Sequence, residues 1–370
     1  MKHNKNMFYK ILKNGGLFLI LIGITFFLIF RKLDFNSVIS TISHINALYL
    51  LPAIGAMFVF ILCESLNTKR NLKALGYETT LLKCITYSAT GFFFSSITPS
   101  ASGGQPMQVY RMCKDNIKIS HSTLVLFIEL VFFQIVSIVY SFIGFFTQYS
   151  LLEESLGSIK YVLVTGLMIN VAILVVLLLA IFSYSATSKI IDVTMGILKF
   201  FGYKKTEGIS EKAYSVINEY RECASYIMKN KTIMFKTFIT TGIQIFALHS
   251  VPYWVYRSFG LSGHSMFVFI GIQAVLFIAV SSLPLPGAVG ASESGFLMLY
   301  KLLFPVPIIN EAMLLSRGIS FYLFLLLSGL FLVVIWIIKS KDNNKKEHAP
   351  VEKLVNKKTD THKVPVKMTC

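Results

Sequence analysis

Two short stretches rich in proline and glycine decide the fold: TPSASGGQP at residues 98–106 and PLPGAVGASE at residues 284–293. Each follows an apolar run that ends in a pair of serines, and the two lie about half a chain apart. Proline removes a backbone donor and glycine tolerates unusual dihedral angles, so each region predicts two short helices joined by irregular backbone. The alternative is that these residues only kink ordinary packed helices, but several breakers at corresponding places favour true breaks.

The surrounding sequence predicts an all-α, polytopic integral membrane protein. Of the 370 residues, 54% are hydrophobic and 14% are charged, and the mean hydropathy is +0.65; soluble domains average about 25% charged residues. We expect about six full spans, at residues 15–30, 47–64, 120–147, 159–183, 232–257 and 311–338. The two broken regions, residues 81–113 and 264–303, are read as re-entrant hairpins, which gives about eight hydrophobic segments.

The basic residues orient these spans. The chain has 35 Lys and Arg against 18 Asp and Glu, a formal net charge of +17. If the N-terminus is cytoplasmic, the spans place five segments on the same side: residues 1–14, 65–83, 111–118, 184–236 and 339–370. Only six basic residues lie elsewhere, namely Arg31, Lys32, Lys160, Arg257, Lys301 and Arg317. Positive charge marks cytoplasmic segments, so both termini are expected to be cytoplasmic and no nucleic-acid partner is expected.

This topology also predicts an inverted repeat. The first broken region begins and ends inside and the second begins and ends outside, so a membrane domain at residues 15–338 divides into halves at residues 15–150 and 159–338. A cytoplasmic amphipathic segment is expected at residues 184–231 and a disordered, Lys-rich tail at residues 339–370. We expect the basic segments to contact anionic lipid headgroups at the cytoplasmic face.

Broken backbone at membrane depth must be buried in protein or face a wet cavity. In transporters built from inverted repeats, pairs of interrupted helices meet near the midplane and form the substrate site. The two hairpins are therefore expected to surround a hydrated cavity. The five cysteines lack a CxxC pair and the histidines are scattered, so the sequence predicts no metal site, no catalytic residues and no cofactor.

Both breaks also resemble a known family. TPSASGGQPMQVYRM, residues 98–112, resembles the T-P-(S)-x-x-G-G-Q-P motif of the lysylphosphatidylglycerol synthase/flippase membrane-domain family. PLPGAVGASESGF, residues 284–296, is similar to that family's P-x-P-G-x-x-G-x-x-E motif, and SRGISFYLFLLLSG, residues 316–329, is similar to its Arg-led final span. The resemblance covers residues 10–338, with one departure: Ser292 stands where many members carry Arg.

The resemblance implies a flippase of the prokaryotic plasma membrane that moves a polar-headgroup phospholipid, such as lysylphosphatidylglycerol, a related aminoacyl lipid or a glycolipid. Bifunctional members also transfer lysine from lysyl-tRNA to phosphatidylglycerol, an activity linked to resistance to cationic peptides and antibiotics. That soluble domain is expected to be absent here, because only residues 339–370 follow the last span, so we expect no enzymatic activity. Lysyltransferase activity and a non-transporting membrane scaffold stay open as alternatives, as do homo-oligomerisation and a separate synthase partner.

Ionisable groups at membrane depth cost about 2.5–3.5 kcal/mol each, so they are expected to pair with one another or to line a pathway. Arg111 and Arg317 are predicted to contact the lipid phosphate together with backbone amides at the glycines of both breaks. Glu129 and Glu293 are predicted to receive a cationic headgroup, although structural ion pairs would use the same residues. The full predicted translocation site is Thr98, Pro99, Gly103, Gly104, Gln105, Arg111, Glu129, Pro286, Gly287, Gly290, Glu293 and Arg317.

Overall fold

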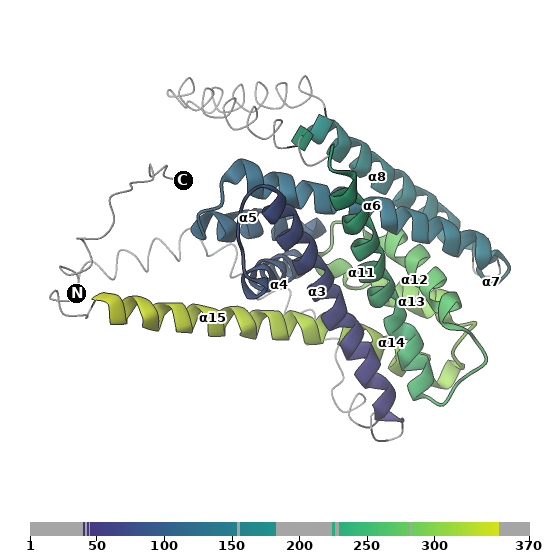
Figure 1. Ribbon diagram of the computed structural model, residues 1–370. Helices are drawn as coiled ribbons and strands as arrows, with labels where there is room; N and C mark the ends of the chain where they lie inside the picture. The colour runs from purple at the N-terminus through teal and green to yellow at the C-terminus, as the bar shows by residue number, and fades with distance from the viewer. Residues whose placement is uncertain are drawn as a thin grey trace, which may run out of the picture.

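The computed structural model describes residues 45–153, 156–182, 229–281 and 283–347, together with the isolated residues Ser40, Ser43, Ala224 and Ser225. Every element within these residues is a helix, which confirms the predicted all-α class (Figure 1). Several expected segments fall outside the described residues. They are the first span at residues 15–30, the N-terminal segment 1–14, most of the amphipathic segment 184–231 and the tail from residue 348.

Four of the described stretches are long and apolar enough to cross a membrane. They are η1 (Ala47–Tyr49) with α3 (Leu50–Ala74), α6 (Ile119–Thr147), the stretch Tyr161–Leu179 within α8 (Leu156–Phe182), and Val306–Ile338. The last stretch runs through η4 (Val306–Ile308), α14 (Ile309–Arg317), the π-helical turn η5 (Gly318–Leu323) and α15 (Phe324–Glu347). Each corresponds to one of the predicted spans.

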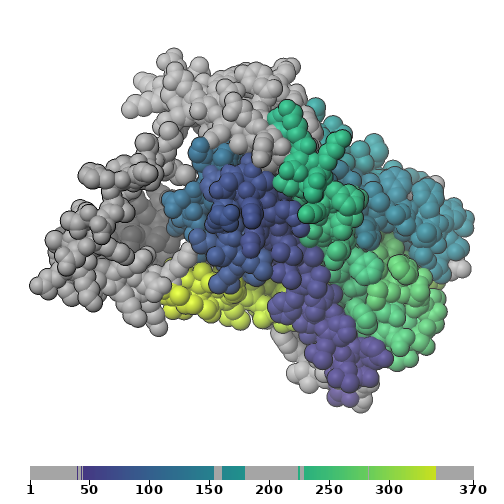
Figure 2. Space-filling model, in the orientation of Figure 1, coloured from purple at the N-terminus to yellow at the C-terminus, as the bar shows by residue number. Residues whose placement is uncertain are grey.

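The predicted span at residues 232–257 forms α11 (Lys231–Ser258), which is long enough to cross but more polar than the other four. Its polar side chains, including Thr237, Thr241, Gln244 and His249, are buried against the protein. α11 packs along α3, and the two lie side by side on the face seen in Figure 2, α3 in purple and α11 in green. Because the polar side chains face neighbouring helices, this helix does not need the apolar composition of a lipid-facing span.

Both proline- and glycine-rich stretches interrupt a helix, as predicted. The first hairpin is α4 (Leu81–Ile97), the single turn η2 (Pro99–Ala101) and α5 (Gly104–Lys114). The second is α12 (Met266–Ser281), the single turn η3 (Pro286–Ala288) and α13 (Ala291–Tyr300). Positive φ angles mark both breaks, at Ser100, Ala101, Gly287, Ala288 and Gly290, so the backbone there cannot continue the preceding helix.

The helices pair reciprocally. α3 packs against α11, and η2 meets η3. α4 of the first hairpin packs against α15, while α12 of the second hairpin packs against α6. If α3 is matched with α11, α4 with α12 and α6 with α15, then the contact of α4 with α15 is the counterpart of the contact of α12 with α6. This is the pattern expected of two structurally related halves. The inversion of those halves relative to the membrane stays a prediction.

An aromatic cluster fixes the second hairpin. Phe269 of α12 and Tyr300 of α13 are fully buried, and Phe304 packs edge-on against Phe269. The rings of Phe296 and Tyr300 stack with centroids 4.1 Å apart, and the Tyr300 hydroxyl donates to Gln273 Oε1 at 2.9 Å. Large aromatic side chains contribute much buried area and a defined geometry, so this cluster holds the two arms of the hairpin together below the break.

One sequence expectation is wrong. The tail was expected to be disordered from residue 339, but α15 continues through Glu347. Lysine and glutamate are good helix formers, and propagating an existing helix by one residue is far easier than starting one. The polar residues after the span therefore extend the helix, which projects away from the bundle in Figure 1.

A close crossing of α6 and α12 supplies a test of this packing. A Cβ added at Gly144 of α6 would meet the backbone of Gly271 in α12, whereas a Cβ added at Gly55 of α3 would have no neighbour within 4 Å. We expect Gly144→Ala to destabilise the protein by about 1–3 kcal/mol, because backbone cannot move aside cheaply. Gly55→Ala is the matched control. Thermal unfolding in detergent should show a lower Tm for Gly144→Ala alone, and equal melting of the two variants would contradict the crossing.

Candidate functional site

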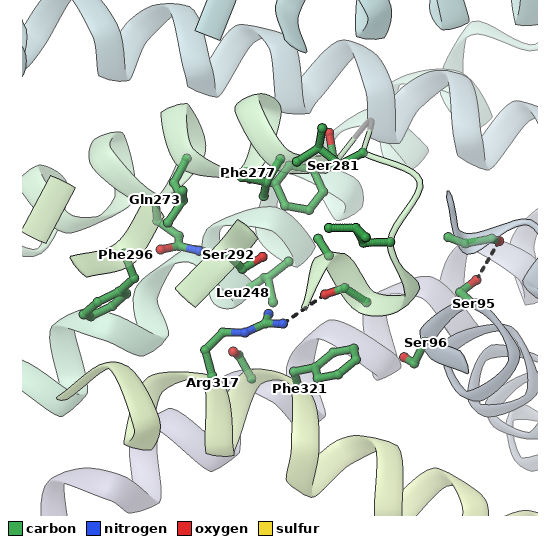
Figure 3. A pocket seen from close by; sticks show the side chains of 18 of the residues that line it. Ser95, Ser96, Leu248, Gln273, Phe277, Ser281, Ser292, Phe296, Arg317 and Phe321 are labelled. Carbon is green, nitrogen blue, oxygen red and sulfur yellow. Dashed lines mark hydrogen bonds between the residues drawn. The ribbon is translucent and has the colours of Figure 1, made fainter. Parts of the chain in front are cut away.

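A cavity of about 280 Å³ lies between the two hairpins, and we call it the hairpin cavity. Its walls come from both breaks, from α12 and from the helix that carries Arg317 (Figure 3). Seven serines contribute to the lining: Ser95, Ser96, Ser100, Ser281, Ser292, Ser316 and Ser320. Phenylalanine and leucine side chains cover much of the remaining wall, to which Gln273 and Arg317 also contribute. The cavity therefore combines a polar strip of small hydroxyl groups with an apolar surround.

A buried ion pair borders this cavity. Arg317 Nε lies 3.1 Å from Glu293 Oε1, and both side chains are largely buried. Arg317 Nη2 donates to the carbonyl of Gly287 at 2.9 Å, the contact drawn as a dashed line from Arg317 in Figure 3. The Tyr322 hydroxyl also donates to Glu293 Oε1 at 3.0 Å, and the Arg317 guanidinium lies over the Phe321 ring at 4.6 Å. These contacts tie the second break to the final span.

Glu293 also caps α13. Its other carboxylate oxygen, Oε2, accepts from the backbone N–H of Gly290, which satisfies a donor at the start of that helix. The carboxylate is thus fully engaged by one cation, one hydroxyl and one amide. The structural ion pair that the sequence left open as an alternative for Glu293 is thus present, and the binding of a cationic headgroup by Glu293 stays a prediction.

A second cavity of about 340 Å³ adjoins the first, and we call it the carboxylate chamber. Both cavities have Phe60, Phe92, Phe133 and Phe277 in their walls. They also share Ser95, Ala101 and Ser281. Besides aliphatic residues, the chamber is lined by two carboxylates and a set of amides: Glu64, Glu129, Asn67, Gln105, Gln108, Gln134, Asn170 and Gln244. A hydroxyl-rich cavity therefore adjoins one that contains carboxylates and amides, and the two have part of their wall in common.

Neutral groups hold the two chamber carboxylates. Gln108 Nε2 donates to Glu64 Oε1 at 2.9 Å. The Thr68 hydroxyl lies 3.1 Å from Glu129 Oε2, and Asn71 Nδ2 lies 3.5 Å from Glu129 Oε1. Within the described residues, neither carboxylate has an ion pair. This arrangement differs from that of Glu293, whose charge is matched by Arg317.

Four of the predicted site residues line one of the two cavities. Gln105 and Glu129 line the carboxylate chamber, and Gly287 and Arg317 line the hairpin cavity. Arg111 lines neither. It lies near the C-terminal end of α5, and its buried Nε has no hydrogen-bond partner among the described residues. The structure therefore does not bring the two arginines together.

The first break is held by Thr98 and by close packing. The Thr98 hydroxyl donates to the Phe94 carbonyl at 2.6 Å and accepts from the Gly103 amide at 2.9 Å. A Cβ at Gly104 would meet the Ser95 hydroxyl and the Gly91 carbonyl. Thr98 and Gly104 thus close the turn and let α4 and α5 approach, while Pro99 begins η2.

The predicted amide cradle is only partly available. The Gly103 amide donates to Thr98, and the Gly290 amide donates to Glu293. At Gly287 the carbonyl is engaged by Arg317, and a Cβ would meet the Phe321 ring. Pro286 begins η3. Several glycines of the breaks are thus explained by backbone geometry and close packing, and their role in binding phosphate stays a prediction.

Several chamber residues were missed from the sequence. Glu64 stands at the end of a predicted span, where a carboxylate is unremarkable. A signal was present nevertheless, because Glu64, Asn67 and Asn71 recur at helical spacing and so share one face of α3. That polar face turns inward toward Glu129 and α11. The spacing of the polar residues within this span, unlike its mean hydropathy, therefore indicates the polar face of α3.

The ion pair at the second break can be tested by a double-mutant cycle. Removing one partner of a buried pair leaves an uncompensated charge and costs about 3–5 kcal/mol. We therefore expect Glu293→Gln and Arg317→Gln each to lower the Tm, and the double variant to lose less than the sum of the two. Glu78→Gln, at an exposed carboxylate, is the control. Strict additivity would show that the pair is energetically unimportant.

Comparison with known proteins agrees with this architecture. Residues 15–328 match the family model described as the lysylphosphatidylglycerol synthase TM region. The chain is also 22% identical over 310 residues to a UPF0104 membrane protein of Archaeoglobus fulgidus, covering 80% of this chain and 89% of that protein. The family match includes both breaks, both cavities and the helix of Arg317. The chain is a membrane protein and belongs to the lysylphosphatidylglycerol synthase TM family.

Proposed function

We propose that the protein translocates a polar-headgroup phospholipid between the two leaflets of a prokaryotic plasma membrane. The observation that carries the proposal is the hairpin cavity, because it lies between the two broken hairpins and gathers hydroxyl groups from both. Transporters built from repeats bind substrate where interrupted helices meet. The family description concerns a membrane region and names a phospholipid.

The cavity offers groups suited to a phosphate ester. Arg317 has five N–H donors, and two of them are used in hydrogen bonds to the second break, at Glu293 and at the Gly287 carbonyl. Ser292 is 7% exposed and lines the cavity, and its hydroxyl makes no hydrogen bond to any described residue. Its hydroxyl and a remaining guanidinium N–H would bind headgroup oxygens, while the acyl chains stay in the bilayer.

The apolar part of the wall supports the same proposal. Phe92, Leu248, Leu276 and Phe277 line the hairpin cavity beside the serines. A lipid needs a polar and an apolar surface at the same site. Its headgroup must exchange hydrogen bonds to water for hydrogen bonds to the protein, while the adjoining glycerol region remains in contact with apolar groups. Rocking of one half against the other would expose this surface to each leaflet in turn.

The choice among possible lipid headgroups rests on the family description alone. Lysylphosphatidylglycerol, another aminoacyl lipid or a glycolipid would each suit a hydroxyl-lined cavity, and we propose the aminoacyl lipid as the first substrate to test because the family's description names it. The matched region is a membrane region, so the proposal is limited to translocation. Cytoplasmic termini and contact of their lysines with anionic lipid belong to the same proposal.

A steric block of the hairpin cavity tests the proposal. The purified chain is reconstituted in phosphatidylglycerol vesicles, and movement of labelled lysylphosphatidylglycerol, phosphatidylglycerol and a glycolipid between leaflets is measured. Ser292→Phe places a ring in the cavity and is expected to reduce translocation by about tenfold or more, an activation barrier higher by about 1.4 kcal/mol. Ser294→Phe is the matched control, because Ser294 lies on the same helix but is exposed and does not line the cavity.

Equal monodispersity and Tm of the two variants in detergent would show that both fold. Translocation that is the same for Ser292→Phe, Ser294→Phe and the unmodified chain would reject the cavity as the lipid path. Absence of any translocation by the unmodified chain would favour the scaffold alternative instead.

A further inference from the structure

Neither carboxylate of the chamber forms an ion pair with a described residue. Arg70 acts on Glu129 electrostatically, but its Nη1 donates to Asn67 Oδ1 at 2.9 Å and its Nη2 to Thr240 Oγ1 at 3.2 Å. No ion pair within 4 Å joins it to Glu64 or Glu129. Each carboxylate instead accepts hydrogen bonds from neutral amides or a hydroxyl, and none of these donors carries the positive charge that would compensate a buried, ionised carboxylate.

The two carboxyl groups also act on each other. Glu64 and Glu129 come from different helices, α3 and α6, yet their charged forms would repel each other electrostatically. Holding charge away from water costs several kcal/mol per group unless an opposite charge compensates it. Within the described part of the chain, the chamber thus holds two buried carboxyl groups without an ion-pair partner, and a bound cation would stabilise their ionised form.

A second observation points to a ligand. Gln244 of α11 is only 5% exposed and lines the chamber, and its side-chain amide makes no hydrogen bond to any described residue. A buried amide without a partner is costly, so nearly all such groups bind something. Gln105 of the first hairpin lines the same chamber and likewise makes no hydrogen bond within the described residues. The two amides therefore have oxygens available beside the two carboxylates.

We propose that the carboxylate chamber binds an alkali cation such as Na⁺, held by oxygens of Glu64, Glu129, Gln105 and Gln244. Carboxylate and amide oxygens are hard ligands that suit hard cations. No group of three or more His, Cys, Asp and Glu side chains that could hold a metal ion occurs among the described residues. The donor set therefore suits a weakly held alkali ion better than a transition metal.

Such an ion would link the first hairpin to three neighbouring helices. Its ligands come from α3, α5, α6 and α11, and its chamber shares part of its wall with the hairpin cavity. If the proposed lipid translocation is correct, binding of the ion would bias the alternation of the two halves. This coupling rests on the proposed function, whereas the binding site itself does not.

Binding can be measured without lipid transport. The full chain, purified in detergent with phosphatidylglycerol and no amine lipid, is titrated with ²²Na⁺ against choline at constant ionic strength, and its Tm is followed in parallel. We expect saturable binding and a Tm that rises with Na⁺ but not with choline. Glu129→Gln and Gln244→Leu are expected to weaken binding by about tenfold or more, equivalent to about 1.4 kcal/mol.

Glu153→Gln is the matched control, since Glu153 is an exposed carboxylate outside both cavities, and it should bind Na⁺ as the unmodified chain does. Gln244→Leu removes no charge and is similar in size, so it keeps the test informative if Glu129→Gln fails to fold. Absence of saturable binding, or equal binding by all variants, overturns the proposal. So does stabilisation by lysylphosphatidylglycerol or by a change of pH without any response to Na⁺.

Discussion

The structure depends on one constraint: backbone that leaves the helical path inside a bilayer must find its hydrogen bonds within the protein. The two breaks meet this demand differently. At the first, one neutral side chain suffices, because the Thr98 hydroxyl bridges the Phe94 carbonyl and the Gly103 amide. At the second, a charged pair is used, in which Glu293 takes the Gly290 amide and Arg317 takes the Gly287 carbonyl.

This difference breaks the symmetry of the two halves. Reciprocal packing relates the helices, but the polar groups are distributed unequally around the breaks. The positive guanidinium lies at the hairpin cavity, and the unpaired carboxylates lie in the chamber next to it. A guanidinium and two carboxyl groups thus lie at neighbouring cavities that share part of their wall. A headgroup phosphate and a cation would each have a separate place, and neither would need to displace the internal ion pair.

Much of the fold was predictable because the bilayer restricts the choices. Apolar runs of sufficient length predict spans, and the Pro- and Gly-rich stretches predict breaks, since few other structures accommodate them. The site was harder to predict. Arg111 follows a break in sequence, yet the helix of α5 carries it away from both cavities. The position of Glu64 in the chamber was not predicted, because the direction of its side chain depends on how α3 is rotated against α6 and α11. Packing between segments far apart in the sequence sets that rotation.

The π-helical turn η5, at Gly318–Leu323, follows Arg317 directly. In an α-helix, residues five apart point in different directions, whereas the wider π turn brings them to the same side. Arg317 and Tyr322 are five apart, and both contact the same oxygen of Glu293. The final span thus contains one residue more than a regular helix would need between these two contacts. Were the turn to regularise into α-helix, α15 would rotate relative to the second hairpin and Glu293 would keep only one of these two partners from the final span. Because of the extra residue, the rotation of the last helix and the hydrogen bonding of the second break depend on each other, and neither can change alone.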